Sequence, residues 1–123
     1  MLKVLVVDDS LVIRAKMRGF LIKLGHSVIG EAKDGREAIL MYKELNPDLI
    51  TMDITMPDMD GIEATRRIID ENPDALIIMV TSHGQEKKVM DAIDAGAKGY
   101  VLKPIRLEKL DSTIDSVVAN YKQ

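Results

Sequence analysis

The chain has 123 residues, the size of one domain, and its net charge of −3 and its 3 % of aromatic residues argue against nucleic-acid binding. It contains no cysteine, which excludes disulfides, thiolate metal sites and cysteine nucleophiles. No apolar run approaches the roughly 20 residues that a membrane helix requires, and the N-terminus shows no signal-peptide cleavage pattern. We therefore expect a cytoplasmic protein that binds neither nucleic acid nor membrane.

Short apolar runs alternate with amphipathic stretches five times along the chain. In chain order, the pattern predicts a strand at 4–7, a helix at 13–24, a strand at 27–32, a turn at 34–35, a helix at 38–45, a strand at 48–52, a helix at 62–69, a strand at 76–80, a helix at 89–97, a strand at 100–102 and a helix at 107–121. The strands lack polar alternation, and each is followed by a helix, which is typical of a parallel sheet covered on both faces. Right-handed crossovers then give a doubly wound (βα)5 sandwich of the α/β class.

Polar residues stand where the predicted strands end. Asp8 and Asp9 follow the first strand, Asp53 the third, Thr81 the fourth and Lys103 the fifth. In doubly wound sheets, ligands bind beyond the carboxyl ends of the strands. Clustered carboxylates repel one another unless a cation joins them, and an all-oxygen ligand set suits Mg2+. Together with a lysine and a hydroxyl, such a cluster provides the groups for phosphoryl transfer onto a carboxylate.

Each of these signals alone has a structural interpretation as well. Asp8, Asp9 and Ser10 could cap a helix. Thr81 could belong to an ordinary turn, and the proline after Lys103 could simply end an edge strand. It is the occurrence of all of them at strand ends that favours a functional site.

In this order and spacing, the motifs resemble receiver domains of bacterial two-component response regulators. They are the Asp8-Asp9 pair, Asp53 within 52–61, Thr81-Ser82, and Lys103-Pro104 after 99–102. The resemblance covers the whole chain and implies the flavodoxin-like strand order 2-1-3-4-5 that CheY also has. It is strongest to stand-alone, CheY-like receivers, so residues 1–123 are expected to form a single receiver domain without an output domain.

The resemblance also implies a role for each site residue. Asp53 would accept a phosphoryl group from a histidine kinase. Asp9, Asp53 and the backbone carbonyl of Thr55 would ligate Mg2+ directly, and Asp8 would act through a bound water. Lys103 would pair with the phosphoryl oxygens.

Three further expectations follow from the same resemblance. Thr81 would donate a hydrogen bond to the phosphoryl group, and Tyr100 would turn inward behind it as a switch. The bond between Lys103 and its following proline would be cis. Thr55 and His83, which differ from the Asn and Glu of enteric CheY, would tune the lifetime of the phosphoryl group.

The implied protein is a monomeric signalling phosphoacceptor with slow self-dephosphorylation, and not an enzyme. In chemotaxis its partners would be a CheA-like kinase, a flagellar motor switch protein and a phosphatase; alternatively, it would be a phosphorelay intermediate or another single-domain regulator. An aspartate-nucleophile phosphatase of the haloacid dehalogenase type is a remote alternative, because it needs two aspartates one residue apart, whereas Asp8 and Asp9 are adjacent. A flavodoxin is disfavoured because these aspartates would repel the FMN phosphate.

Overall fold

Five parallel strands form one sheet in the order β2-β1-β3-β4-β5, as the computed structural model of residues 1–121 shows. The strands are β1 (Lys3–Val7), β2 (Ser27–Ala32), β3 (Leu49–Asp53), β4 (Ile77–Thr81) and β5 (Gly99–Leu102). The helices are α1 (Leu11–Lys23), α2 (Gly35–Leu45), α3 (Gly61–Glu71), α4 (Glu86–Asp94) and α5 (Leu107–Tyr121). The predicted doubly wound sheet and its strand order are confirmed; residues 122–123 of the expected domain lie outside the described residues.

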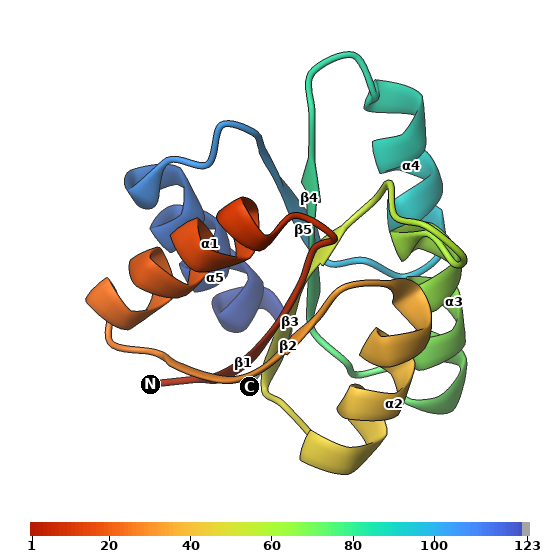
Figure 1. The fold of residues 1–123 in the computed structure, drawn as a ribbon, viewed down its shortest axis with the longest axis horizontal. Helices are drawn as coiled ribbons and strands as arrows, with labels where there is room; N and C mark the ends of the chain where they lie inside the picture. Colours follow the sequence, from red (N-terminus) through yellow and green to blue (C-terminus); the bar gives the residue numbers. More distant parts are fainter. Residues whose placement is uncertain (122–123) are drawn as a thin grey trace.

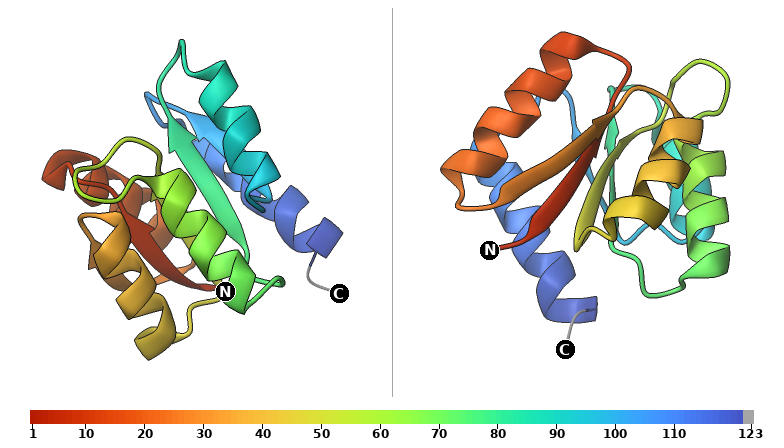
Figure 2. Two further views of the ribbon diagram at one scale, coloured as in Figure 1. Left: turned by 90° about the vertical axis from the view of Figure 1, so that its right-hand side faces the viewer. Right: turned by 60° about the horizontal axis from the view of Figure 1, so that its bottom comes forward.

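The helices cover both faces of the sheet. Helices α1 and α5 lie on one face, and α2, α3 and α4 lie on the other (Figures 1 and 2). Successive side chains of a strand point to opposite faces, so Val4 and Val6 of β1 belong to the core beneath α1 and α5, whereas Leu5 and Val7 belong to the other core. Two buried faces explain why β1, β3 and β4 consist mostly of buried apolar residues. No helix among residues 1–121 is both long and apolar enough to cross a membrane.

Short polar side chains cap the first three helices. Ser10, Asp34 and Asp60 each accept a hydrogen bond from the backbone N–H three residues later, which satisfies a donor that the helix itself leaves free. The turn predicted at 34–35 is therefore wrong. Asp34 is the N-cap, and Gly35 is already the first residue of α2.

Helix α4 differs from the prediction at both ends. It begins at Glu86 and stops at Asp94, so Ala97, which was predicted to be helical, lies outside it. The reason is Gly96, which adopts a left-handed φ of 117° and packs so closely that a Cβ would lie 2.8 Å from the side chain of Ile69. The chain turns there, and Ala97 lies in the following loop, where it is buried.

Candidate functional site

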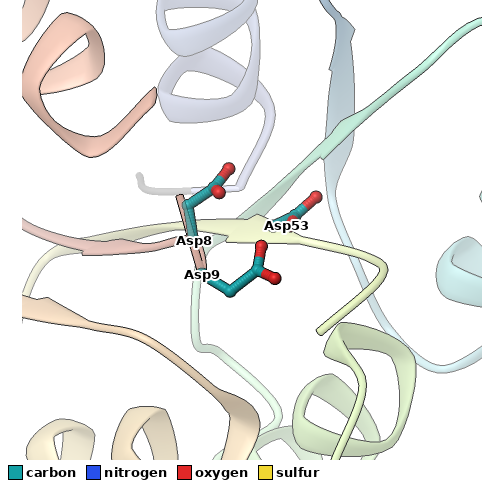
Figure 3. A group of neighbouring side chains, drawn as sticks. All are labelled: Asp8, Asp9 and Asp53. Atoms are coloured by element: carbon teal, nitrogen blue, oxygen red, sulfur yellow. The ribbon is translucent and has the colours of Figure 1, made fainter. Parts of the chain in front are cut away.

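Three carboxylates gather where β1 and β3 end. Asp8 directly follows β1, Asp9 comes next, and Asp53 is the last residue of β3 (Figure 3). One oxygen from each lies within 4.8 Å of the others. Asp8 and Asp53 are 2 % and 6 % exposed, and Asp9 is exposed. The neighbouring positions of β1 and β3 in the sheet therefore bring Asp53 close to the Asp8-Asp9 pair, which is far from it in the sequence.

Lys103 supplies a positive charge to this cluster. Its Nζ atom lies 3.2 Å from Oδ2 of Asp8 and 3.2 Å from Oδ1 of Asp53. Burial raises the pKa of Asp53 from 3.8 to about 6; the charge of Asp8 adds to the rise, and Lys103 opposes it. Burial also acts to lower the pKa of Lys103, but the two carboxylates outweigh it and raise that pKa. With all groups ionised, three carboxylates face one ammonium group, which leaves two negative charges in excess.

The chemistry of this cluster fits a hard divalent cation. All its ligand atoms are carboxylate oxygens, which Mg2+ prefers over nitrogen or sulfur ligands. A divalent ion would also balance the two excess negative charges. The Asp8 carboxylate is held in place, since its Oδ1 accepts a hydrogen bond of 2.8 Å from the backbone N–H of Ser10.

Arg14 fixes the loop that carries the first two aspartates. Its Nη1 donates a 2.6 Å hydrogen bond to the backbone carbonyl of Asp8, and its Nε donates to Glu31 of β2 at 3.2 Å. Glu31 also pairs with Arg18 at 3.1 Å. Sequence reasoning did not identify these residues; the helical spacing of two arginines was the only signal, and that spacing is common on exposed helix faces.

The start of α3 fixes the end of β3. The backbone N–H of Gly61 donates a 2.8 Å hydrogen bond to the carbonyl of Ile54. A Cβ at Gly61 would overlap the carbonyl oxygen of Asp53, so only glycine fits between α3 and the strand. This close approach sets the position of the Asp53 backbone, and the sequence did not reveal it.

Thr81 lies at the end of β4, next to β3, one residue beyond the partner of Asp53. Its buried hydroxyl donates a 2.8 Å hydrogen bond to Oε1 of Gln85 and has a longer contact of 3.4 Å with the Ser82 carbonyl. Nε2 of Gln85 lies 3.4 Å from the hydroxyl of Thr55, which is exposed. Gln85 connects these two threonines, and no pattern in the sequence indicates this role.

Tyr100 and His83 border a groove of about 520 Å3 beside Lys103. The Tyr100 side chain is 48 % exposed, so the inward position expected behind a phosphoryl group is not the one in this structure. His83 is exposed as well. The bond between Lys103 and Pro104 is cis, as predicted.

Comparisons with known proteins identify the family of this chain. A family model described as "Response regulator receiver domain" matches residues 4–115. The chain is 44 % identical to "Chemotaxis protein CheY" of Thermotoga maritima, over 94 % of this chain and 96 % of the relative. It is 42 % identical to "Chemotaxis protein CheY" of Bacillus subtilis, over 94 % and 97 %.

A solved structure resembles it closely too. CheY in the crystal structure of a CheX-CheY-BeF3-Mg2+ complex from Borrelia burgdorferi superposes with a TM-score of 0.88 at 37 % identity, covering 94 % of this chain and 87 % of that one. The fold, the acidic cluster and the sequence similarity all indicate the same family. The chain belongs to the response regulator receiver domain family, and it is a CheY-like signalling phosphoacceptor rather than a catalytic enzyme.

Proposed function

We propose that Asp53 is the phosphoacceptor of this receiver and that a histidine kinase is the donor. The observation that carries the proposal is the environment of its carboxylate, which is nearly buried, lies 3.2 Å from Lys103, and is grouped with Asp8 and Asp9. A carboxylate oxygen of Asp53 attacks the phosphorus of phosphohistidine, and the phosphorus–nitrogen bond breaks. The imidazole leaves with the bonding electron pair, and an aspartyl phosphate remains.

The surrounding residues hold the groups that this transfer needs. Asp8, Asp9, Asp53 and the backbone carbonyl of Thr55 would hold Mg2+, which when bound neutralises charge on the transferring phosphoryl oxygens. Lys103 exchanges its contact with Asp53 for one with the phosphoryl oxygens.

Groups next to the acceptor complete the site. The hydroxyl of Thr81 donates a hydrogen bond to the phosphoryl group, and Tyr100 moves inward behind it. His83 and Thr55 limit the approach of the water that would hydrolyse the acyl phosphate, because His83 borders the groove beside Lys103.

We further propose that residues 1–123 act as a monomeric, stand-alone receiver of a chemotaxis system in the cytoplasm. The similarity to CheY proteins over nearly their full length supports this. Its partners would then be a CheA-like kinase and a flagellar motor switch protein. The Borrelia relative is in a complex with CheX, and we propose that a protein of this kind, acting as a phosphatase, also binds this chain. The second candidate is an intermediate of a phosphorelay.

Incubation with acetyl phosphate and Mg2+ tests the acceptor. Intact-protein mass spectrometry should find one added phosphoryl group on the wild type and none on Asp53→Asn, whereas the exposed control variant Asp58→Asn should be phosphorylated like the wild type. Equal phosphorylation of Asp53→Asn would refute the assignment. Transfer rates from a purified CheA-type kinase and from a phosphorelay phosphotransfer protein would decide between the two pathways. Faster transfer from the phosphotransfer protein would favour the phosphorelay.

A further inference from the structure

The hydroxyl of Thr81 is already engaged in this structure. A hydroxyl group can donate only one hydrogen bond, and that of Thr81 is donated over 2.8 Å to the side-chain oxygen of Gln85. The amide nitrogen of Gln85 reaches the hydroxyl of Thr55 at 3.4 Å. The Gln85 side chain thus spans from the end of β4 to the loop after β3, across the side of the site opposite Asp8 and Asp9.

A phosphoryl oxygen on Asp53 requires the same hydroxyl proton. This step rests on the proposed function, in which Thr81 donates a hydrogen bond to the phosphoryl group. We propose that Gln85 is a latch on the unphosphorylated site: it holds the Thr81 hydroxyl and contacts Thr55, and phosphorylation must displace it. Gln85 is therefore a positioning residue that acts through Thr81, and it opposes phosphorylation.

The place of Gln85 in the fold connects this latch to α4. Gln85 is the N-cap residue of α4, yet its side chain makes no capping hydrogen bond, because it is directed to Thr81 instead. Only Val89 and Ala92 of α4 are buried, so few side chains hold the helix to the sheet. Gln85 also borders an apolar groove of about 250 Å3 between α4 and β5, which Tyr100 lines as well. Release of Gln85 would therefore free the first turn of α4 and alter the wall of this groove.

Two substitutions of Gln85 test whether its hydrogen bond with the Thr81 hydroxyl is responsible for the effect. Gln85→Met keeps the length of the side chain but removes the amide, so the Thr81 hydroxyl becomes available. Gln85→Glu keeps an oxygen that accepts the Thr81 hydrogen bond. Lys87→Met, on the exposed side of α4, is the matched control. The probe is beryllofluoride with Mg2+, a phosphoryl mimic, and its affinity is measured by NMR titration.

We expect Gln85→Met to bind beryllofluoride about two- to tenfold more tightly than the wild type, the range that one neutral hydrogen bond gives. Gln85→Glu and Lys87→Met should show no gain. In a Thr81→Ala background the gain from Gln85→Met should vanish, because the latch acts through that hydroxyl. Unchanged or weaker binding by Gln85→Met would overturn the proposal, and so would an equal gain without the Thr81 hydroxyl.

The failure of the latch is distinguishable from the failure of the proposed function. A wild type that binds beryllofluoride, with no effect of Gln85→Met, refutes the latch alone. A wild type that does not bind beryllofluoride at all refutes Asp53 as the acceptor. In that case, NMR spectra of the protein without beryllofluoride test the latch. Gln85→Met must shift the resonances of both Thr81 and Thr55, and unshifted resonances refute the latch.

Discussion

Replacing Asp53 with Asn should stabilise the metal-free protein at neutral pH. Burial, assisted by the charge of Asp8, raises the pKa of Asp53 from 3.8 to about 6. At about 1.4 kcal/mol per pKa unit, this rise corresponds to at most about 3 kcal/mol of cost to the folded state. Solvent at the edge of the site reduces the expected gain in the free energy of unfolding to about 2 kcal/mol.

The gain should depend on pH in one direction only. A carboxyl whose pKa is higher in the folded state destabilises that state once it is ionised. The cost is fully present above about pH 6, shrinks as the pH falls toward 3.8, and disappears below that pH, where Asp53 is protonated in both states. The advantage of Asp53→Asn should therefore fall from about 2 kcal/mol at pH 7.5 to about 0.4 kcal/mol at pH 4.

Urea unfolding in EDTA, followed by circular dichroism at pH 7.5, 6 and 4, measures this difference. The control is Asp115→Asn, which removes an exposed carboxylate from α5 and should show no such gain. A stability of Asp53→Asn at or below that of the wild type at pH 7.5 would refute the reasoning. So would a gain that stays constant across the pH range, because it would then have a cause other than ionisation.

Four further changes test other parts of the structure. Mg2+ at ten times its Kd should raise the free energy of unfolding of the wild type by about 1.4 kcal/mol, whereas the free energy of unfolding of Asp9→Asn should not change. A wild-type thermal midpoint that does not respond to Mg2+ would contradict the metal site. Thr51 has a buried hydroxyl without a hydrogen-bond partner in the described part of the chain, so Thr51→Val should stabilise the fold by about 1 kcal/mol in urea unfolding; a loss of stability would show that the hydroxyl is satisfied. Gly19 lies within α1, and apart from its chain neighbours and the backbone of α1 itself no atom lies within 4 Å of where its Cβ would be. Gly19→Ala should therefore add about 0.5–1 kcal/mol in the same assay, and a destabilised variant would reveal a packing role. Finally, His83→Ala should lose its phosphoryl group faster than the wild type when decay is followed by mass spectrometry, and rates within about two-fold of each other would mean that His83 does not shield it.

Most of the fold was predictable because its cause is local in the sequence. Unbroken apolar runs such as that of β4 require burial on both faces, and helices between them require parallel strands. The ends of helices and strands were less predictable where a residue type is common in two kinds of local structure. Asp34 and Gly35 suit both a turn and a helix start, and only the packed structure decides between these conformations.

The candidate site was predictable for a related reason. Residues at the ends of parallel strands must share one edge of the sheet, so Asp8, Asp9 and Asp53 could be grouped without knowing a single distance. The residues that support them could not be found in this way. Arg14 contacts a backbone carbonyl, and Gln85 contacts a hydroxyl. Such contacts depend on side-chain conformations, which leave no pattern in the sequence.

Among residues 1–121, the sheet also separates the buried side chains into two cores that have no member in common. Leu21 belongs to the core beneath α1 and α5, and Ile68 belongs to the core beneath α2, α3 and α4. Because substitutions without shared neighbours add independently, one layer of the protein can accumulate changes while the other keeps its packing. A designer could therefore redesign the layer of α2, α3 and α4 for a new binding partner and retain the stability supplied by α1 and α5.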